Sequence, residues 1–181
     1  MTAATLPLAA LTADQALTSL NLSRDDRLLI TGAVGSVGGM AVQLAALAGI
    51  SAAGLVSRPE HESAVLDLGA TSVYSNPVSA GEFDAIFDTA GVFDYPSLLS
   101  KDGRLVTVSD ETIPATLEQR AASAMHNYVQ QDPYRFRELA ALVDEGRLVL
   151  RVAEQCPLAR IEQAHRTAEA GGLLGKVVIT M

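Results

Sequence analysis

The chain of 181 residues is 49% hydrophobic and 19% charged, a composition that fits a folded domain with a buried core and excludes a disordered chain. Its formal net charge of -8 argues against a protein that binds nucleic acid through clustered Lys and Arg, but it allows a small anionic ligand held by backbone amides. The single cysteine, Cys156, excludes an intramolecular disulfide and any metal site built from several thiolates.

The first half of the chain alternates short apolar runs with segments of helical character. Residues 1–22 are expected to form a lead-in helix or linker. After them, strands are predicted at residues 27–31, 51–57 and 72–74, and helices at residues 40–49 and 59–69. The second of these helices starts with Pro59 and ends with Gly69, residue types that commonly mark the two ends of a helix.

The second half continues the alternation. A buried strand ends in Asp88 within residues 83–91; further strands are predicted at 102–110, 148–153 and 175–181, and helices at 132–146 and 157–172. Residues 121–129 are ambiguous, because they fit either an extended edge strand or a poor helix. The repeated strand–helix units predict one α/β domain over residues 1–181, a doubly wound, mostly parallel Rossmann sheet of about six strands with helices on both faces.

No apolar run approaches the roughly 18 residues needed to span a bilayer, and the amino-terminal segment lacks the basic region of a signal peptide. We therefore expect no membrane association and a cytoplasmic protein. The acidic composition likewise predicts no nucleic-acid partner.

A glycine-rich turn, ITGAVGSVGGMA at residues 30–41, lies between a predicted strand and a predicted helix. Gly35 permits a tight turn there, and Gly38 permits either close packing of helix on strand or close passage of a pyrophosphate. The helix start would offer free amides to phosphates. Ala33 stands where the dinucleotide fingerprint usually has its first glycine, and a turn that serves only helix packing is the alternative. A phosphate-loop NTPase is excluded, because no lysine lies near the turn.

The end of the second predicted strand indicates which dinucleotide binds. An NAD site usually places Asp or Glu there to hold the ribose 2′-hydroxyl, whereas an NADP site avoids that charge and adds a base. Here the strand runs into Val56, Ser57 and Arg58, with no acidic residue before Glu60. Ser57 can hydrogen-bond a 2′-phosphate and Arg58 can pair with it. The sequence therefore favours NADP(H), with a solvated Arg58 as the alternative.

A family resemblance covers nearly the whole chain. It is carried by the segments LPLAALTADQAL, LLITGAVGSVGGMAVQLA, VSRPEHESAVLDLGA, FDAIFDTAG, DGRLVTVS, ELAALVDEGRL and AHRTAEAGGLLGKVVIT, in this order. Together they resemble the cofactor-binding domain of the quinone oxidoreductase branch of the medium-chain dehydrogenase/reductase superfamily. The resemblance implies a six-stranded Rossmann fold, NADPH as hydride donor, and reduction of a quinone or an α,β-unsaturated carbonyl. Zinc is not needed in this branch.

The resemblance also implies roles for single residues. Thr12, in a segment before the first helix, resembles a threonine near the nicotinamide. Thr89 matches a residue beside the adenosine half of the cofactor, Val108 and Ser109 lie near the nicotinamide ribose, and Lys176 lies near the pyrophosphate, with an exposed lysine as the alternative. The residues that match the pyrophosphate turn and then the 2′-phosphate site are Gly35, Ser36, Val37, Gly38, Ser57 and Arg58.

Several positions depart from the family pattern. Ser36 replaces a usual glycine, His61 stands where many relatives have a lysine for the 2′-phosphate, and Asn76 replaces a tyrosine that stacks on adenine in some. His126 and Asn127 fall where relatives often carry two aromatic residues beside the nicotinamide. His61 and His165 are expected to be solvated, and no catalytic residue is identified; His126 is only a candidate general acid.

The family also has an amino-terminal, GroES-like catalytic domain that forms the other wall of the active-site cleft. This chain begins in the segment that normally follows that domain, so we expect it to be weakly active or inactive alone. A non-catalytic dinucleotide sensor or scaffold is the alternative function. A short-chain dehydrogenase is excluded, because no tyrosine has a lysine four residues later. Relatives commonly dimerise by joining their sheets, and residues 121–129 contain no charge or proline, so we expect a homodimer through that edge.

Overall fold

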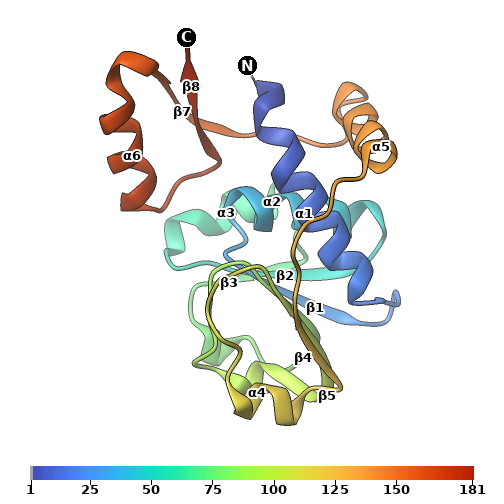
Figure 1. Cartoon of the computed structure of the whole chain (residues 1–181). Coiled ribbons are helices and arrows are strands. Elements are labelled where there is room, and N and C mark those ends of the chain that lie inside the picture. The colour runs from blue at the N-terminus through green and yellow to red at the C-terminus, as the bar shows by residue number, and fades with distance from the viewer. Residues whose placement is uncertain (1) are drawn as a thin grey trace.

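A wholly parallel sheet organises the chain in the computed structural model, which describes residues 2–181. Its six strands lie in the order β3-β2-β1-β4-β5-β6, and Figure 1 labels all of them except β6. In chain order they are β1 (Arg27–Thr31), β2 (Ser51–Leu55), β3 (Ser72–Tyr74), β4 (Phe83–Asp88), β5 (Leu99–Thr107) and β6 (Ser123–His126). The order reverses between β1 and β4, where a Rossmann sheet opens a crevice at the carboxyl ends of its strands. The predicted fold class is confirmed.

Helices cover both faces of the sheet. The α-helices are α1 (Leu6–Ser19), α2 (Ser36–Leu47), α3 (Glu62–Leu66), α4 (Ala115–Arg120), α5 (Pro133–Asp144) and α6 (Ile161–Ala170). Short 3₁₀ helices are η1 (Thr2–Thr5), η2 (Pro59–His61), η3 (Pro77–Ser79), η4 (Pro96–Leu98) and η5 (Leu158–Arg160). Among the described residues, no helix has the length and apolar character needed to cross a membrane.

Side chains that alternate along each strand belong to two different hydrophobic clusters, one on each face of the sheet. In β1, Leu28 and Ile30 belong to the larger cluster, which includes residues of α1, α2 and α5. Leu29 points to the opposite face and belongs to the smaller cluster, which includes Leu117 of α4. All three strand residues are fully buried. This two-sided burial explains why the strands read as continuous apolar runs in the sequence.

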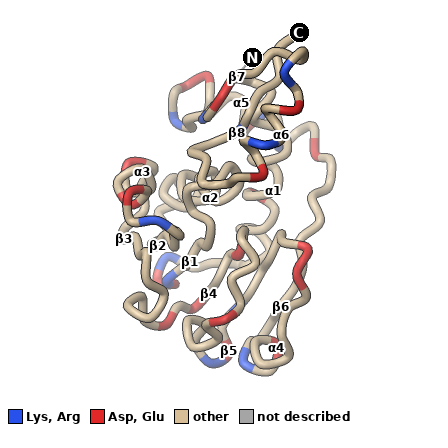
Figure 2. Tube along the Cα trace, turned by 90° about the vertical axis from the view of Figure 1, so that its left-hand side faces the viewer, with Lys and Arg blue, Asp and Glu red and all other residues tan. Residues whose placement is uncertain are grey.

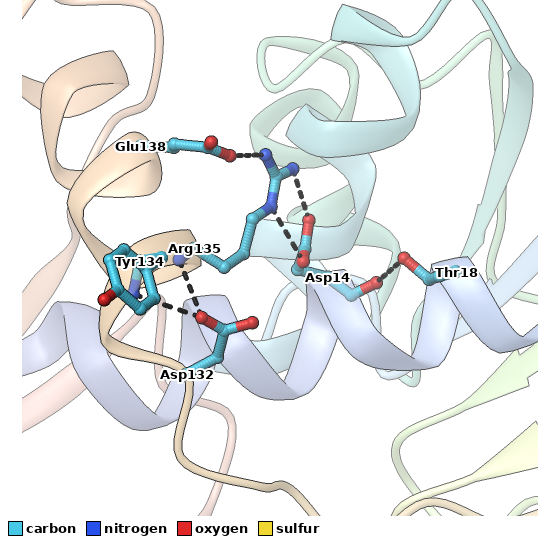
Figure 3. Close-up of polar contacts among 6 residues, drawn as sticks. All are labelled: Asp14, Thr18, Asp132, Tyr134, Arg135 and Glu138. Carbon is cyan, nitrogen blue, oxygen red and sulfur yellow. Dashed lines mark hydrogen bonds and ion pairs between the residues drawn. The ribbon is translucent and has the colours of Figure 1, made fainter.

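Helix α1 is tied to α5 by an ion-pair cluster (Figure 3). Arg135 donates from Nε to Asp14 Oδ2 at 3.0 Å and from Nη2 to Asp14 Oδ1 at 2.6 Å. Its Nη1 also donates to Glu138 Oε2 at 2.5 Å, and these two carboxylates raise the pKa of Arg135 above its ordinary value. Asp132 caps α5 by accepting from the backbone amides of Tyr134 and Arg135, which agrees with the helix start predicted there.

The carboxyl-terminal residues form a second, two-stranded parallel sheet apart from the first (Figure 1). It pairs β7 (Val152–Pro157) with β8 (Lys176–Thr180), and α6 connects the two strands. The strand predicted at residues 148–153 is therefore wrong for its first four residues. The physical reason is that the backbone of Val149 is bonded by a side chain: its N–H donates to Gln43 Oε1 at 2.7 Å, and its carbonyl accepts from Gln43 Nε2 at 3.2 Å.

Three further features complete the description of the fold. The ambiguous segment at residues 121–129 contains β6, which pairs with β5 at the edge of the sheet. The two ends of the chain lie at the same end of the molecule, where η1 contacts β8 (Figure 1). Lys and Arg residues are spread over several elements and do not gather along one of them (Figure 2).

Candidate dinucleotide site

The turn after β1 depends on a glycine with a positive φ angle. Gly32 has φ +60°, and a Cβ atom there would lie 2.6 Å from Thr89 Oγ1. The turn closes when the N–H of Gly35 donates to the carbonyl of Gly32 at 2.8 Å. The chain thereby leaves the end of β1 and enters α2 within four residues. Sequence reasoning stressed Gly35 and missed Gly32, whose position directly after the strand was the available signal.

Gly38 allows α2 to lie against this turn. A Cβ atom on Gly38 would lie 2.3 Å from the carbonyl oxygen of Gly32 and 2.9 Å from Cα of Ala33. Both are backbone atoms of a closed turn, so they cannot move aside as a flexible side chain would. Of the two uses that the sequence left open for Gly38, the structure supports close approach of the helix to the end of the strand.

The first turn of α2 presents unbonded amides. The first helical hydrogen bond runs from the N–H of Gly39 to the carbonyl of Gly35, and within residues 2–181 no acceptor faces the N–H groups of Ser36, Val37 and Gly38. The cap residue provides no side-chain acceptor, and the first turn contains no acidic residue. Three free donors and the positive end of the helix dipole therefore point to the same place, an arrangement that binds phosphate.

A cavity of about 260 Å³ adjoins the turn at the carboxyl ends of β1, β2 and β4. It is lined by Gly32, Val34, Leu55, Val56, Ser57, Ser75, Pro77, Ala90 and Val92. These walls are mostly apolar with a few hydroxyl groups, as in pockets that hold a flat heteroaromatic base. A larger cavity of about 450 Å³ opens between α1, α2 and α5, beside Leu22 and Ile50 at the opposite ends of the strands. It is far less suited to a dinucleotide, which binds at the carboxyl ends.

The residues after β2 divide between two places. Ser57 lines the 260 Å³ cavity, and no acidic side chain does. Arg58, the next residue, is exposed and is not among the residues that line the cavity; its guanidinium lies against Gly172, where a Cβ atom would come within 2.6 Å of Nη1. Asn76 caps η3 by accepting from the N–H of Val78. His61 is only 7% exposed, so the prediction that it is solvated is wrong: the η2 turn folds its ring inward, and its Nδ1 is buried with no hydrogen-bond partner among residues 2–181. His165 is exposed, as predicted.

A buried carboxylate fixes the strand ends around this cavity. Asp88 is fully buried and accepts four hydrogen bonds within residues 2–181. Two come from hydroxyls of the neighbouring strands, Thr31 Oγ1 at 2.6 Å and Thr107 Oγ1 at 2.7 Å. Two come from the loop after β4, the N–H groups of Gly91 and Val92, each at 3.0 Å. Asp88 thus joins three strands to the loop that lines the cavity.

Other residues implicated by the sequence lie around the same edge. Thr89 binds the end of β1, because its hydroxyl donates to the carbonyl of Thr31 at 2.7 Å. Val108 and Ser109 follow β5, with the N–H of Val108 donating to the carbonyl of Asp88 at 3.0 Å. At the end of β6, His126 Nδ1 and Asn127 Nδ2 are buried without a partner among the described residues.

Two implicated residues come from the ends of the chain. Thr12 is buried in the middle of α1, so its expected place before the first helix is wrong; the apolar run around it continues the helix on both sides. Lys176 begins β8 and shares a narrow cavity of about 20 Å³ with Ser36 and Gly39 of α2. Within residues 2–181 no group of three or more His, Cys, Asp or Glu side chains is arranged to hold a metal ion.

The strand order, the glycine turn, the free helix start and the adjoining cavity define a dinucleotide-binding domain of the Rossmann class. The model of the zinc-binding dehydrogenase family matches residues 62–179, and the chain belongs to this family. It has the fold of the cofactor-binding domain of dehydrogenases and reductases in the medium-chain superfamily, as the resemblance implied. A comparison with curated proteins gives no match.

Solved structures support the assignment. The quinone oxidoreductase of Coxiella burnetii is 26% identical with a TM-score of 0.90, covering 98% of this chain and 60% of its own. The cobalt- and zinc-bound thermostable alcohol dehydrogenase of Pyrobaculum aerophilum is 27% identical with a TM-score of 0.85, covering 99% and 56%. A mycobacterial protein complexed with NADPH, 24% identical with a TM-score of 0.83 over 99% and 64%, shares the fold. The chain thus spans about 60% of the length of these structures.

Proposed function

We propose that this chain is the NADP(H)-binding part of a zinc-independent reductase that acts on a quinone or an α,β-unsaturated carbonyl. The observation that carries the cofactor preference is the end of β2, where Ser57 lines the cavity, the exposed Arg58 follows it in the chain, and no acidic side chain lines the cavity. An acidic residue there would repel a 2′-phosphate, whereas a hydroxyl and a guanidinium would bind one. The quinone branch is supported by the sequence motifs and by similarity to the Coxiella enzyme.

In this proposal each part of the site binds one part of the dinucleotide. The free amides of Ser36, Val37 and Gly38 hold the pyrophosphate, and the cavity beside Gly32 holds the adenine. The carboxyl ends of β5 and β6 face the nicotinamide half, which supplies a hydride when bound. The residues that would complete the site are Thr12, Thr89, Val108, Ser109 and Lys176. The chain's own contribution is to position the cofactor.

Replacing Arg58 with alanine is expected to narrow the preference for NADPH over NADH about tenfold, since one hydrogen bond to a charged group contributes about 1.5–3 kcal/mol. Ser57→Asp should act in the same direction, because it puts a negative charge on the wall of the cavity. Fluorescence titration of both nucleotides measures the ratio. Arg24→Ala, which removes another exposed arginine, is the control and should change neither affinity. Equal affinities of the parent chain for NADPH and NADH would contradict the preference.

The alternative function is a dinucleotide sensor or scaffold without catalysis. A measurement of quinone or enone reduction distinguishes this alternative from the proposed reductase. The proposal expects NADPH-dependent reduction of a simple quinone when the site is complete. Tight binding of NADPH by the complete protein with no quinone or enone reduction would favour the sensor.

We also propose that the chain forms a homodimer through β6. This strand ends the sheet, and residues 121–129 contain neither charge nor proline to discourage pairing. Light scattering is expected to give twice the chain mass of 18.9 kDa. Met125→Glu, which places a charge on a side chain that is 40% exposed in this strand, should shift the mass toward the monomer. A monomeric parent chain at high concentration would contradict the proposal.

A further inference from the structure

A guanidinium from the carboxyl-terminal segment lies behind the glycine turn. Arg151, which follows α5 and precedes β7, donates from Nη2 to the carbonyl of Val34 at 2.7 Å and to the carbonyl of Gly35 at 3.1 Å. Its side chain is largely removed from water, and this burial lowers the pKa of Arg151 from its ordinary value, although an arginine remains charged. In the described part of the chain no carboxylate forms an ion pair with it.

The absence of a side chain at Gly39 makes room for this guanidinium. A Cβ atom on Gly39 would lie 2.0 Å from Nη2 and 3.0 Å from Cζ of Arg151. The arginine backbone is also fixed from both sides. Gln43, which is buried, binds both backbone groups of Val149, and the N–H of Lys176 donates to the carbonyl of Arg151 at 3.2 Å. The position of the guanidinium therefore depends on Gly39 and Gln43, which lie more than a hundred positions before Arg151 in the chain.

The two carbonyls that Arg151 holds belong to peptide groups of the phosphate turn. The carbonyl of Gly35 shares its peptide group with the N–H of Ser36, one of the three free donors at the start of α2. Fixing the oxygen at one end of a planar peptide group fixes the direction of the N–H at the other end. A cation on the oxygen also polarises the peptide group and strengthens its N–H as a donor. Both effects favour an anion at the helix start.

We propose that Arg151 is a positioning residue for the pyrophosphate of the bound dinucleotide: it holds the turn carbonyls so that the free amides face the pyrophosphate, and it adds an unpaired positive charge behind them. The proposal rests on the proposed dinucleotide function but not on the choice between NADPH and NADH, because both contain the pyrophosphate. Gly39 and Arg151 act together, because the guanidinium fits only where residue 39 has no side chain.

The first test uses Arg151→Gln, which can still donate a hydrogen bond but carries no charge. It is expected to weaken binding of NADPH and NADH about tenfold each, as loss of a charge-assisted interaction implies. Binding of 2′-AMP, which lacks the pyrophosphate, should stay within about twofold, and Arg151→Lys should recover part of the loss. Arg147→Gln is the matched control, because this exposed arginine lies four residues away and pairs with Glu145. It should leave all three affinities unchanged.

The second test is a double-mutant cycle with Gly39→Ala. In the parent chain the added methyl group displaces the guanidinium, so NADPH affinity should fall. In an Arg151→Ala background the guanidinium is gone, and Cδ1 of Leu68, which would lie 3.1 Å from the added carbon, is the end of a flexible side chain that can move aside. The same change should then leave affinity unaltered. Parent-like binding of NADPH and NADH by Arg151→Gln, or an equal loss of 2′-AMP binding, would overturn the proposal. A parent chain that binds NADH more tightly than NADPH would overturn only the proposed preference for NADPH. A parent chain that binds neither nucleotide would overturn both the proposed dinucleotide function and the role of Arg151.

Discussion

Replacing Asp88 with alanine is expected to lower the free energy of unfolding by about 3–5 kcal/mol, because it removes the acceptor of a buried, fully bonded network. The Thr31 hydroxyl and two backbone N–H groups that now bind its carboxylate would lose this acceptor, and the Thr107 hydroxyl would keep only its longer contact with Ser109 Oγ at 3.2 Å. Each unpartnered buried donor costs about 1–3 kcal/mol, and water can relieve only those nearest the cavity. The loop that lines the cavity would lose its anchor at the same time, so dinucleotide affinity should fall with stability.

Chemical denaturation of the variant and of Asp84→Ala measures the effect. Asp84 lies in the same strand, but it is only partly buried and its carboxylate accepts from the backbone N–H of Arg27 at the surface. Its replacement should cost about 1 kcal/mol or less. Similar losses for the two variants would show that Asp88 is no more than another strand residue and would contradict the role assigned to its network.

Gly38→Ala is expected to destabilise the chain by about 3 kcal/mol and to weaken NADPH binding by about 100-fold or more. Alanine normally stabilises a helix relative to glycine, so the expected sign is opposite to the helix propensity. The reason is the contact of 2.3 Å that a Cβ atom would make with the carbonyl oxygen of Gly32. To relieve it, α2 must move away from the turn and carry its free amides with it, and loss of two such bonds accounts for the change in affinity.

Gly35→Ala is the matched control for stability. Gly35 has φ -68° and ψ 179°, a conformation open to any residue, and its Cβ atom would approach only the carbonyl of Gly32 at 3.2 Å. Its replacement should therefore change the free energy of unfolding by less than about 1 kcal/mol. Thermal denaturation and nucleotide titration of both variants give the comparison. A Gly38→Ala variant that is as stable as the parent and binds NADPH normally would show that the helix can tolerate the added atom.

Local signals in the sequence predicted much of the fold. The strand ending at Asp88 and the helix start at Asp132 agree with the structure because apolar runs and capping residues act over a few neighbouring positions. The glycine turn was recognised for the same reason. The sequence also showed that no acidic residue directly follows β2, since this depends only on which residues come after the strand; the structure adds that Ser57 lines a cavity there.

The contacts between distant segments could not be predicted in this way. Asp88 binds a hydroxyl 57 positions earlier in the chain, and Arg151 binds carbonyls 116 and 117 positions earlier. The residues that flank Asp88 and Arg151 in the sequence do not indicate these partners. The same holds for His61, whose burial depends on how η2 folds against the body of the domain and not on its polar neighbours.

The contact between η1 and β8 makes the backbone nearly a closed ring. A short flexible linker across this contact can join the two ends, and new ends can be opened at an exposed turn such as Gly146, after α5. The order of strands in the six-stranded sheet is the same wherever the ring is cut outside an element. Circular permutants of this domain should therefore fold, and a second domain fused to either end of this chain would emerge on the same side of the molecule.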